Sequence, residues 1–464
     1  MMQADHPFTL NGWSVSFLEL AFYFGCPGVN AFGGFVTLVH FVEGKSYECI
    51  VYHGDGRGEG IPVRADFVAQ EGTPAILQVL VEYSDAVAEC VAVGFGVTAT
   101  KYISQLKATN VSRMMSICKL TYRFTIIAGI IITILILCFS GLIAKYSLNE
   151  TSLTTTIQFG SILLFFSIIY GVQNGILTGF EAFKSIATNT FIGSFIQSIF
   201  MIAGAYYYGV NGAILGFGIG VISIYIVNKV SIKRKYHEYR INASDTHIRK
   251  EDYKIIINYS IPATLSALTV TPAFWLIRTI LVRHEGYATL ASFEAADQWR
   301  IMMLFIPTAI SQIALPILSC ILNDNKKFKD VLLVNLGLIT VISTLIVLLI
   351  LFFGESMMNM YGKDFTDKQP LIYLAISTIF SSASNLIEMS IYSKNKMWGN
   401  LLLNFVWALS MILMSDILVG RGFGATGLAI AVLISYVIKT ICMSGYIKYI
   451  LRNERLHNNN TDIQ

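Results

Sequence analysis

Seven ionisable side chains lie inside or at the edges of long apolar segments, and they are the residues with the clearest capacity for chemistry. They are Arg278, Glu294, Asp297, Arg300, Glu388, Asp416 and Lys439. An ionisable residue in the centre of a bilayer costs about 2.5–3.5 kcal/mol on insertion scales, so it usually faces a cavity or a partner. These residues are therefore candidates for charged-substrate binding, for ion pairing or for proton transfer.

Glu294, Asp297 and Arg300 follow one another at intervals of three residues. Asp297 and Arg300 would share one face of a helix, where opposite charges pair. A purely structural ion pair at the start of a helix is an equally simple interpretation. Arg278 lies toward the end of another apolar segment, where its side chain can also reach the membrane interface.

Glu388 lies about one helical turn before the end of the apolar segment Leu371–Tyr392. The nearest residue of opposite charge along the chain is Lys394, six positions later. A carboxyl group in this position is a candidate for a protonatable coupling group. An interhelical structural hydrogen bond is the alternative.

Four prolines fall within two neighbouring apolar segments: Pro262, Pro272, Pro307 and Pro316. Proline removes a helical hydrogen bond and can kink a membrane span. Bent helices around a central cavity suit a transporter that opens alternately to each side. A kink that serves only packing is the other possibility.

The elements that must position these residues are ten apolar segments. The chain has 464 residues, of which 54% are hydrophobic and 13% charged, whereas a soluble domain carries about a quarter charged residues. About 20 apolar residues cross a bilayer. We predict an all-α, multi-pass membrane protein with spans at Phe124–Ala144, Thr155–Phe180, Ser185–Asn228 (two spans with a turn at Tyr206–Gly209), Ile255–Ile277, Ile301–Asn323, Val331–Gly354, 370–392, 397–418 and 425–447.

Basic residues alternate between the two sets of loops that these spans create. One set holds 22 lysines and arginines and the other holds five: Lys145, Arg283, Lys363, Lys368 and Arg421. The positive-inside rule assigns the first set, and with it the C-terminus, to the cytoplasm. The densest basic stretch, residues 231–254, is predicted to be a cytoplasmic linker, with residues 94–230 before it, residues 255–450 after it and a cytoplasmic tail at 451–464.

Residues 1–93 differ from the rest of the chain, with one lysine and three isoleucines. Three interpretations remain open: a soluble N-terminal domain, two poorly defined spans, or a segment translated in the wrong reading frame. The motifs at His53–Gly60 and Gly422–Gly427 resemble phosphate-binding loops, but neither has the strand and helix context that such loops need. The seven cysteines show no zinc-type spacing. We expect no metal, no cofactor and no nucleic-acid partner.

Four segments resemble the bacterial polysaccharide (O-antigen) flippases of the multidrug/oligosaccharidyl-lipid/polysaccharide exporter superfamily. Residues 291–300 (ASFEAADQWR), with 304–307 (LFIP) and 314–319 (ALPILS), resemble the eighth span of that family. The segments 94–104 (GFGVTATKYIS), 171–184 (GVQNGILTGFEAFK) and 259–262 (YSIP) are similar to its second, fourth and seventh spans. The resemblance covers about residues 94–450.

The resemblance implies twelve spans in two pseudo-symmetric six-helix bundles, of which ten are recognisable and the first two would fall within 1–93. It also implies a transporter rather than an enzyme, one that moves undecaprenyl-diphosphate-linked glycan units across the inner membrane for lipopolysaccharide or related polysaccharides. Arg278 and Arg300 would then bind the diphosphate, Asp297 and Glu294 would pair with them, and Glu388 would couple transport. Pro262, Pro307 and Pro316 would bend the helices.

Further partners implied by the resemblance are membrane lipids, a polysaccharide polymerase and chain-length machinery. Two other functions remain open. One is a multidrug or cation antiporter of the same superfamily, which would need an acidic residue in the first span. The other is a membrane glycan polymerase or ligase, which needs a large external loop. The longest external loops predicted here, around 282–298 and after Gly354, have about fifteen residues.

Overall fold

The computed structural model describes residues 92, 94–146, 154–239, 248–322, 324–359 and 367–461. Apart from Ala92, the segment 1–93 lies outside the described residues, and so does the motif at His53–Gly60. The described residues form helices and turns and include no strand.

Residues 94–106 are helical. The further elements are α4 (Val111–Tyr146), α5 (Thr154–Gly179), α6 (Phe183–Glu238), α7 (Lys250–Ile255), the π-helix η2 (Ile256–Ser260), α8 (Ile261–Cys320), α9 (Asn325–Asn359), α10 (Gln369–Ser393), α11 (Met397–Val419) and α12 (Gly424–Thr461). Within them, ten helical segments of the described chain are long and apolar enough to cross a membrane. The predicted all-α, multi-pass architecture is confirmed.

Two of the long helices are hairpins that reverse at a single glycine. In α6 the reversal lies at Gly209 (φ 60°, ψ −140°), directly after the exposed tyrosines 206–208, as predicted. In α8 it lies at Gly286 (φ 82°, ψ −178°). The prediction of an external loop at residues 282–298 is therefore wrong. Glycine adopts positive φ without steric cost, so the turn needs no loop and the charged residues around it remain helical.

The described helices form two bundles that repeat one another along the chain. The offset from the start of α4 to the start of α9 is the same as the offset from the start of α6 to the start of α11. The turn between α5 and α6 contains Glu181 at φ 57°, and the equivalent turn between α10 and α11 contains Asn395 at φ 59°. We call residues 94–106 with α4, α5 and α6 the first bundle, and α8 to α12 the second bundle.

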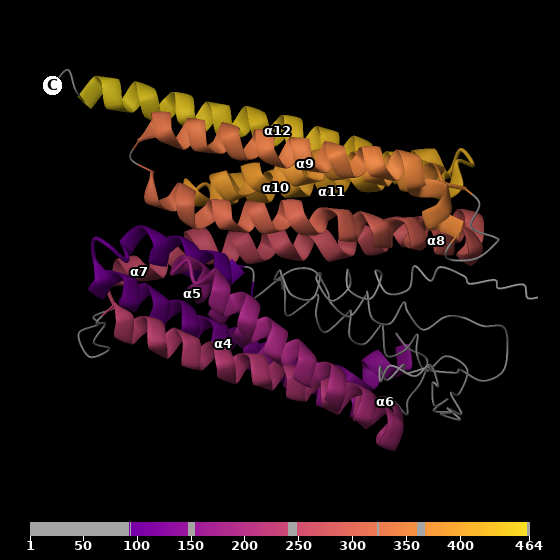
Figure 1. Cartoon of the computed structure of the whole chain (residues 1–464), viewed down its shortest axis with the longest axis horizontal. Helices are drawn as coiled ribbons and strands as arrows, with labels where there is room; N and C mark the ends of the chain where they lie inside the picture. Colours follow the sequence, from indigo (N-terminus) through magenta and orange to yellow (C-terminus); the bar gives the residue numbers. More distant parts are fainter. Residues whose placement is uncertain are drawn as a thin grey trace, which may run out of the picture.

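The two bundles lie close together at one end and diverge toward the other (Figure 1). The near end carries the turns 180–182 and 394–396 and most basic residues, so we call it the basic end. Each bundle has its own apolar core, and a smaller buried cluster that includes Tyr259, Leu315 and Tyr392 lies near the basic end.

The described end of the connection between the bundles, from α7 onward, continues into α8 without a break. The short helix α7 packs on α4, where Tyr253 contacts Phe124 edge-on, and then continues through η2 into α8. The π-helical turn comes directly before Pro262, which occupies the first turn of α8 and cannot donate a backbone hydrogen bond. A π-helical turn is a common way to accommodate such an irregularity.

Candidate functional site

Arg278 and Glu294 face each other across the α8 hairpin. Each lies eight residues from Gly286, so the reversal places them at the same height. Arg278 Nε donates to Glu294 Oε1 at 2.6 Å, and its Nη2 donates to Oε2 at 3.2 Å. Both side chains are 35% exposed. This is a two-pronged pair, the strong geometry for a guanidinium and a carboxylate.

Asp297 and Arg300 form a second pair, one turn deeper. Arg300 Nε donates to Asp297 Oδ1 at 2.5 Å, and both residues are buried. Arg278 Nη2 also lies 3.6 Å from Asp297 Oδ2, so the four residues form one cluster. Both guanidinium groups lie over the ring of Phe274, at 5.8 Å for Arg278 and 5.2 Å for Arg300.

The two arginines are therefore balanced by two carboxylates. In this structure the cluster has no net charge, and the deeper pair is closed to solvent. Arg278 and Glu294 are the members that water or a ligand can reach. Sequence spacing predicts only the pair Asp297–Arg300, because the contact between Arg278 and Glu294 depends on the sharp turn at Gly286.

Glu388 lies in a separate buried network of the second bundle. Its Oε1 accepts hydrogen bonds from the Tyr392 hydroxyl at 2.9 Å and from the amides of Asn400 and Asn404 at 2.7 Å each. Its Oε2 accepts one from Lys439 Nζ at 3.2 Å. The carboxylate thus accepts hydrogen bonds from four side chains on three helices.

The residues near Glu388 in the sequence do not indicate these hydrogen-bond partners. Lys394, the nearest basic residue along the chain, pairs with Glu454 at 2.6 Å instead. The usable signal is the helical spacing of Asn400 and Asn404, because two amides four residues apart in an apolar span mark a polar face. Nothing in the local pattern indicates Lys439, 51 residues away.

A row of aromatic rings lies between the two charged networks. Lys439 Nζ lies 5.1 Å from the centre of the Trp407 ring, and that ring is 6.2 Å from the ring of Phe274. Phe274 in turn contacts both arginines. The two charged networks of the second bundle are therefore connected by cation–π contacts at each end and by the contact between the Trp407 and Phe274 rings.

The first bundle has neutral polar side chains around the position that is equivalent to Glu388. Asn174 occupies the position that corresponds to Glu388 when the two bundles are aligned by their helix starts, and it accepts a hydrogen bond from Asn228 at 2.9 Å. Asn228 accepts one from Asn189, which also donates to Ser231. The described part of the first bundle thus carries an amide network where the second carries a carboxylate and an ammonium.

The proline predictions have mixed structural outcomes. Pro262 lies in the first turn of α8, whereas Pro272, Pro307 and Pro316 lie inside the helix. The backbone torsions at the internal prolines stay helical, and Gly286 is the non-helical position inside α8. The π-helical turn next to Pro262 is thus the clearest backbone irregularity associated with a proline. Bending at Pro307 and Pro316 stays a prediction.

The motif Gly422–Gly427 comprises the end of the turn between α11 and α12 and the first residues of α12. Gly422 (φ 82°) and Gly424 (φ 50°) reverse the chain between α11 and α12. Asp416 is exposed near the end of α11. Among the described residues, no group of three histidine, cysteine or acidic side chains is placed to hold a metal ion.

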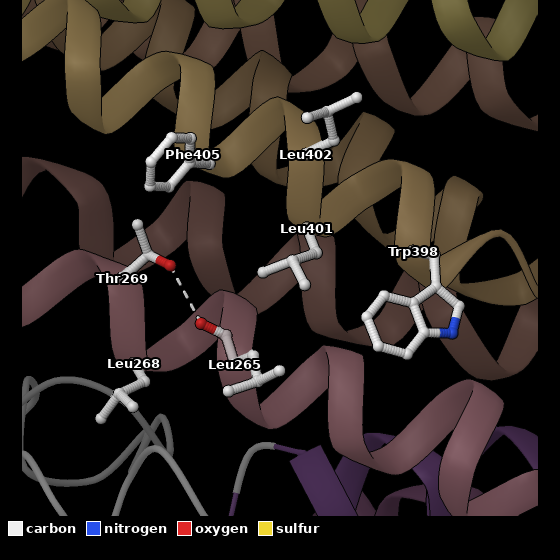
Figure 2. A pocket seen from close by; sticks show the side chains of 7 residues that line it. All are labelled: Leu265, Leu268, Thr269, Trp398, Leu401, Leu402 and Phe405. Carbon is white, nitrogen blue, oxygen red and sulfur yellow. Dashed lines mark hydrogen bonds between the residues drawn. The ribbon is translucent and has the colours of Figure 1, made fainter.

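A separate groove of about 520 Å³ lies between α8 and α11 (Figure 2). Its lining is apolar apart from the indole nitrogen of Trp398 and the hydroxyl of Thr269, which donates to the Leu265 carbonyl at 2.9 Å. The groove offers no charge and suits hydrocarbon. The residues that line it are Leu265, Leu268, Thr269, Trp398, Leu401, Leu402 and Phe405.

Comparison with known proteins decides the family. Residues 95–367, more than half of the chain, match the model of the polysaccharide biosynthesis protein family. The chain belongs to this family. The predicted resemblance to polysaccharide flippases of the superfamily is thereby confirmed.

A similar curated member is the EPS I polysaccharide export inner membrane protein EpsE of Ralstonia solanacearum, 24% identical over 194 residues. A second EpsE, of Ralstonia nicotianae, is 23% identical over the same length. The match spans 40% of this chain and 44% of each relative, so less than half of either relative's length is covered.

Solved structures share the fold. A multidrug resistance MATE family transporter of the MOP superfamily, in an outward-facing conformation, has a TM-score of 0.71 at 17% identity over 82% of this chain and 88% of that chain. A MOP superfamily transporter from Pyrococcus furiosus has a TM-score of 0.71 at 18% identity, with the same coverage. The family member described here therefore has the fold of a MOP superfamily transporter.

Proposed function

We propose that this protein is a lipid-linked oligosaccharide flippase. It moves undecaprenyl-diphosphate-linked glycan units from the inner to the outer leaflet by alternating access, for a surface polysaccharide such as O-antigen. Family membership supports a role in polysaccharide biosynthesis, and the MATE-like fold supports transport between two bundles. The observation that carries the proposal is Arg278, a partly exposed guanidinium on an apolar membrane helix, eight residues from the turn at Gly286.

Arg278 is the substrate-contacting residue in this proposal. A diphosphate cannot cross hydrocarbon without compensating charge, and a guanidinium binds phosphate in the same two-pronged geometry as a carboxylate. Arg278 can therefore exchange Glu294 for the diphosphate. Arg300 and Asp297, buried and mutually paired, hold the position of Arg278 through the contact at 3.6 Å.

Glu388 is the proposed coupling group. Its carboxylate is balanced by Lys439. Protonation of Glu388 would release Lys439 and leave a cation beside Trp407. Because an uncompensated buried charge is costly, this step would change the packing of the second bundle.

The basic end faces the cytoplasm in this proposal, because most lysines and arginines lie there. The C-terminus is then cytoplasmic, and the protein is a multi-pass protein of the bacterial inner membrane, as the name of the relative EpsE states for that protein. A polysaccharide polymerase and chain-length machinery are the proposed downstream partners.

The test is surface glycan export in the native host with Arg278→Gln in place of the wild type. We expect export to fall at least about tenfold, as loss of a charged hydrogen bond to the substrate predicts. Arg278→Lys should keep part of the activity. Arg283→Gln is the matched control, because Arg283 is exposed on the same helical hairpin. Wild-type export by Arg278→Gln and Arg300→Gln at normal protein level would contradict the cationic site.

The similarity to MATE structures favours one second candidate, a multidrug antiporter. The two functions separate in one experiment with the deletion strain. A flippase deletion abolishes surface glycan and leaves resistance to cationic dyes unchanged. An antiporter deletion lowers dye resistance and leaves the glycan intact.

A further inference from the structure

Lys101 lies where the two bundles meet at the basic end. It comes from the helix of residues 94–106, and its side chain is fully buried. Its ammonium group lies 5.4 Å from the centre of the Tyr102 ring and 5.0 Å from that of Tyr259, which belongs to the segment leading into α8. Its Nζ donates a short hydrogen bond to Asn395 Oδ1 in the turn between α10 and α11.

Further contacts close the same interface. The hydroxyl groups of Thr98 and Ser260 are 2.8 Å apart. A Cβ atom on Gly94 would lie 1.9 Å from Thr264 Oγ1 and 2.9 Å from the Ser260 carbonyl oxygen. The backbones therefore approach as closely as glycine allows. We call the contacts of residues 94–104 with Tyr259–Thr264 and with Asn395 the latch.

The partner of Lys101 is unusual for a buried cation. In the described part of the chain, the ammonium is held by a neutral amide oxygen and two rings rather than by a carboxylate. A buried ion pair is costly to break, because it leaves one charge uncompensated. A neutral partner suits a contact that must open and close repeatedly, since the released ammonium can regain water.

Tyr392 connects the latch to Glu388. Its hydroxyl donates to Glu388 Oε1 at 2.9 Å. Its backbone carbonyl accepts a hydrogen bond from the Tyr259 hydroxyl at 3.0 Å. Tyr259 is the residue whose ring covers Lys101. Three consecutive contacts thus join the buried carboxylate of the second bundle to a cation of the first.

We propose that Lys101 closes the basic end of the transporter and that Tyr392 is the positioning residue through which Glu388 sets the stability of that closure. This inference rests on the proposed function, because a closure that opens is useful only to a protein that alternates between two sides. Loss of the charge on Glu388 weakens its bond to Tyr392, then the Tyr259 contact, and so releases Lys101.

The first test is hydrogen exchange measured by mass spectrometry on the purified full-length protein. Lys101→Met should speed exchange roughly tenfold in residues 94–106 and 392–400, as loss of a hydrogen bond to a charged group predicts. Exchange in α9 should not change, which separates local opening from general destabilisation. Lys184→Met is the matched control, because Lys184 is an exposed lysine of the same end. Unchanged exchange at 94–106 would overturn the role of Lys101.

The second test concerns the link through Tyr392. Tyr392→Phe removes only the hydroxyl and keeps the ring and the carbonyl, yet it should speed exchange at 94–106, as should Glu388→Gln. Tyr373→Phe, on the same helix near its opposite end, should have no effect. If Tyr392→Phe and Tyr373→Phe both leave residues 94–106 as protected as in the wild type, the link does not exist.

A cross-link separates the latch from the proposed substrate. The double variant Thr98→Cys/Ser260→Cys should form a disulfide on oxidation, because the two oxygens are 2.8 Å apart. Oxidised protein in vesicles should lose translocation of a lipid-linked oligosaccharide, and a reductant should restore it. Failure to form the disulfide, or equal translocation with and without reductant, would overturn the latch. If neither the wild type nor the reduced variant translocates the oligosaccharide while hydrogen exchange responds as expected, the proposed function fails and the latch stands.

Discussion

Arg278 and Arg300 carry the same charge but have different surroundings. Arg300 is buried against Asp297, whereas Arg278 and Glu294 remain 35% exposed. A buried pair resists separation and a partly exposed pair can exchange partners. The two arginines are therefore suited to different roles, with Arg300 fixing the geometry and Arg278 contacting the ligand.

The buried pair can be tested through stability. Arg300→Gln leaves the Asp297 carboxylate without its main partner, which typically costs about 3–5 kcal/mol. We expect a clearly lower Tm for the purified protein. Asp297→Asn in the same chain removes the remaining charge, so the double variant should regain part of the loss. A single variant as stable as the wild type would show that the pair is not structurally important.

Contacts between residues that are close in the sequence can be predicted from spacing, and contacts between distant residues cannot. The spacing of three residues predicts the pair Asp297–Arg300. The contact of Glu388 with Lys439 joins α10 to α12 and has no local signature. The role of Lys101 is not predicted from the sequence for the same reason, because its partner Asn395 lies 294 residues further along the chain.

At the scale of elements, α6 shows how a tight membrane hairpin is built. A Cβ on Gly212 would lie 2.0 Å from the Gly204 carbonyl oxygen, and one on Gly216 would lie 2.3 Å from the Phe200 carbonyl oxygen. Small residues allow helix backbones to approach closely in membranes. The two arms of α6 therefore meet along a seam of glycines that follows from the turn at Gly209.

Gly216→Val should destabilise this hairpin. The added side chain meets backbone atoms that cannot move aside, and overpacking of this kind costs about 1–3 kcal/mol. Gly141→Val is the matched control, because a Cβ there meets nothing within 4 Å. Thermal denaturation followed by fluorescence gives the comparison. Equal Tm values for the two variants would mean that the seam tolerates separation.

Apolar length predicts the spans well but places some of their ends incorrectly. The apolar segment predicts a start at Phe124 for α4, whereas the helix begins at Val111. Its first turns carry basic residues on one side and bury Met114, Met115 and Cys118 on the other. The mean hydropathy of this segment does not reveal its amphipathic character, because the charged side chains offset the apolar ones.

At the scale of the whole molecule, the described bundles meet mainly at the basic end and diverge elsewhere (Figure 1). The internal repeat explains the two bundles, but it does not set the contact between them. That contact depends on side chains that differ between the repeats, such as Asn395 at the position equivalent to Glu181. For this reason the resemblance to the family predicts the two bundles but not the contacts between them.

Gly94→Ala should hold the basic end apart. Its added methyl group would overlap Thr264 and the Ser260 carbonyl. We expect faster hydrogen exchange at 94–106 together with reduced glycan export. Gly160→Ala is the control, because a Cβ at that position meets nothing within 4 Å. Normal exchange and export in Gly94→Ala would show that the close approach is dispensable.

The orientation of the molecule is tested by fusions. Green fluorescent protein placed after Gln464 should fluoresce, because the C-terminus is expected in the cytoplasm. Alkaline phosphatase fused after Arg421, in the turn at the opposite end, should be active. The reverse pattern would place the basic end outside and would contradict the charge assignment.

The buried pair of Glu388 and Lys439 also has a consequence for how the chain is made. A ribosome adds about 5–20 residues per second, so the 51 residues between them take roughly 3–10 s to synthesise. During that interval the carboxylate has been synthesised and its counter-ion does not yet exist. Asn400 and Asn404 emerge only 12 and 16 residues later. These two amides are thus the earliest interhelical partners available, and they would shelter the nascent helix until the final helix arrives.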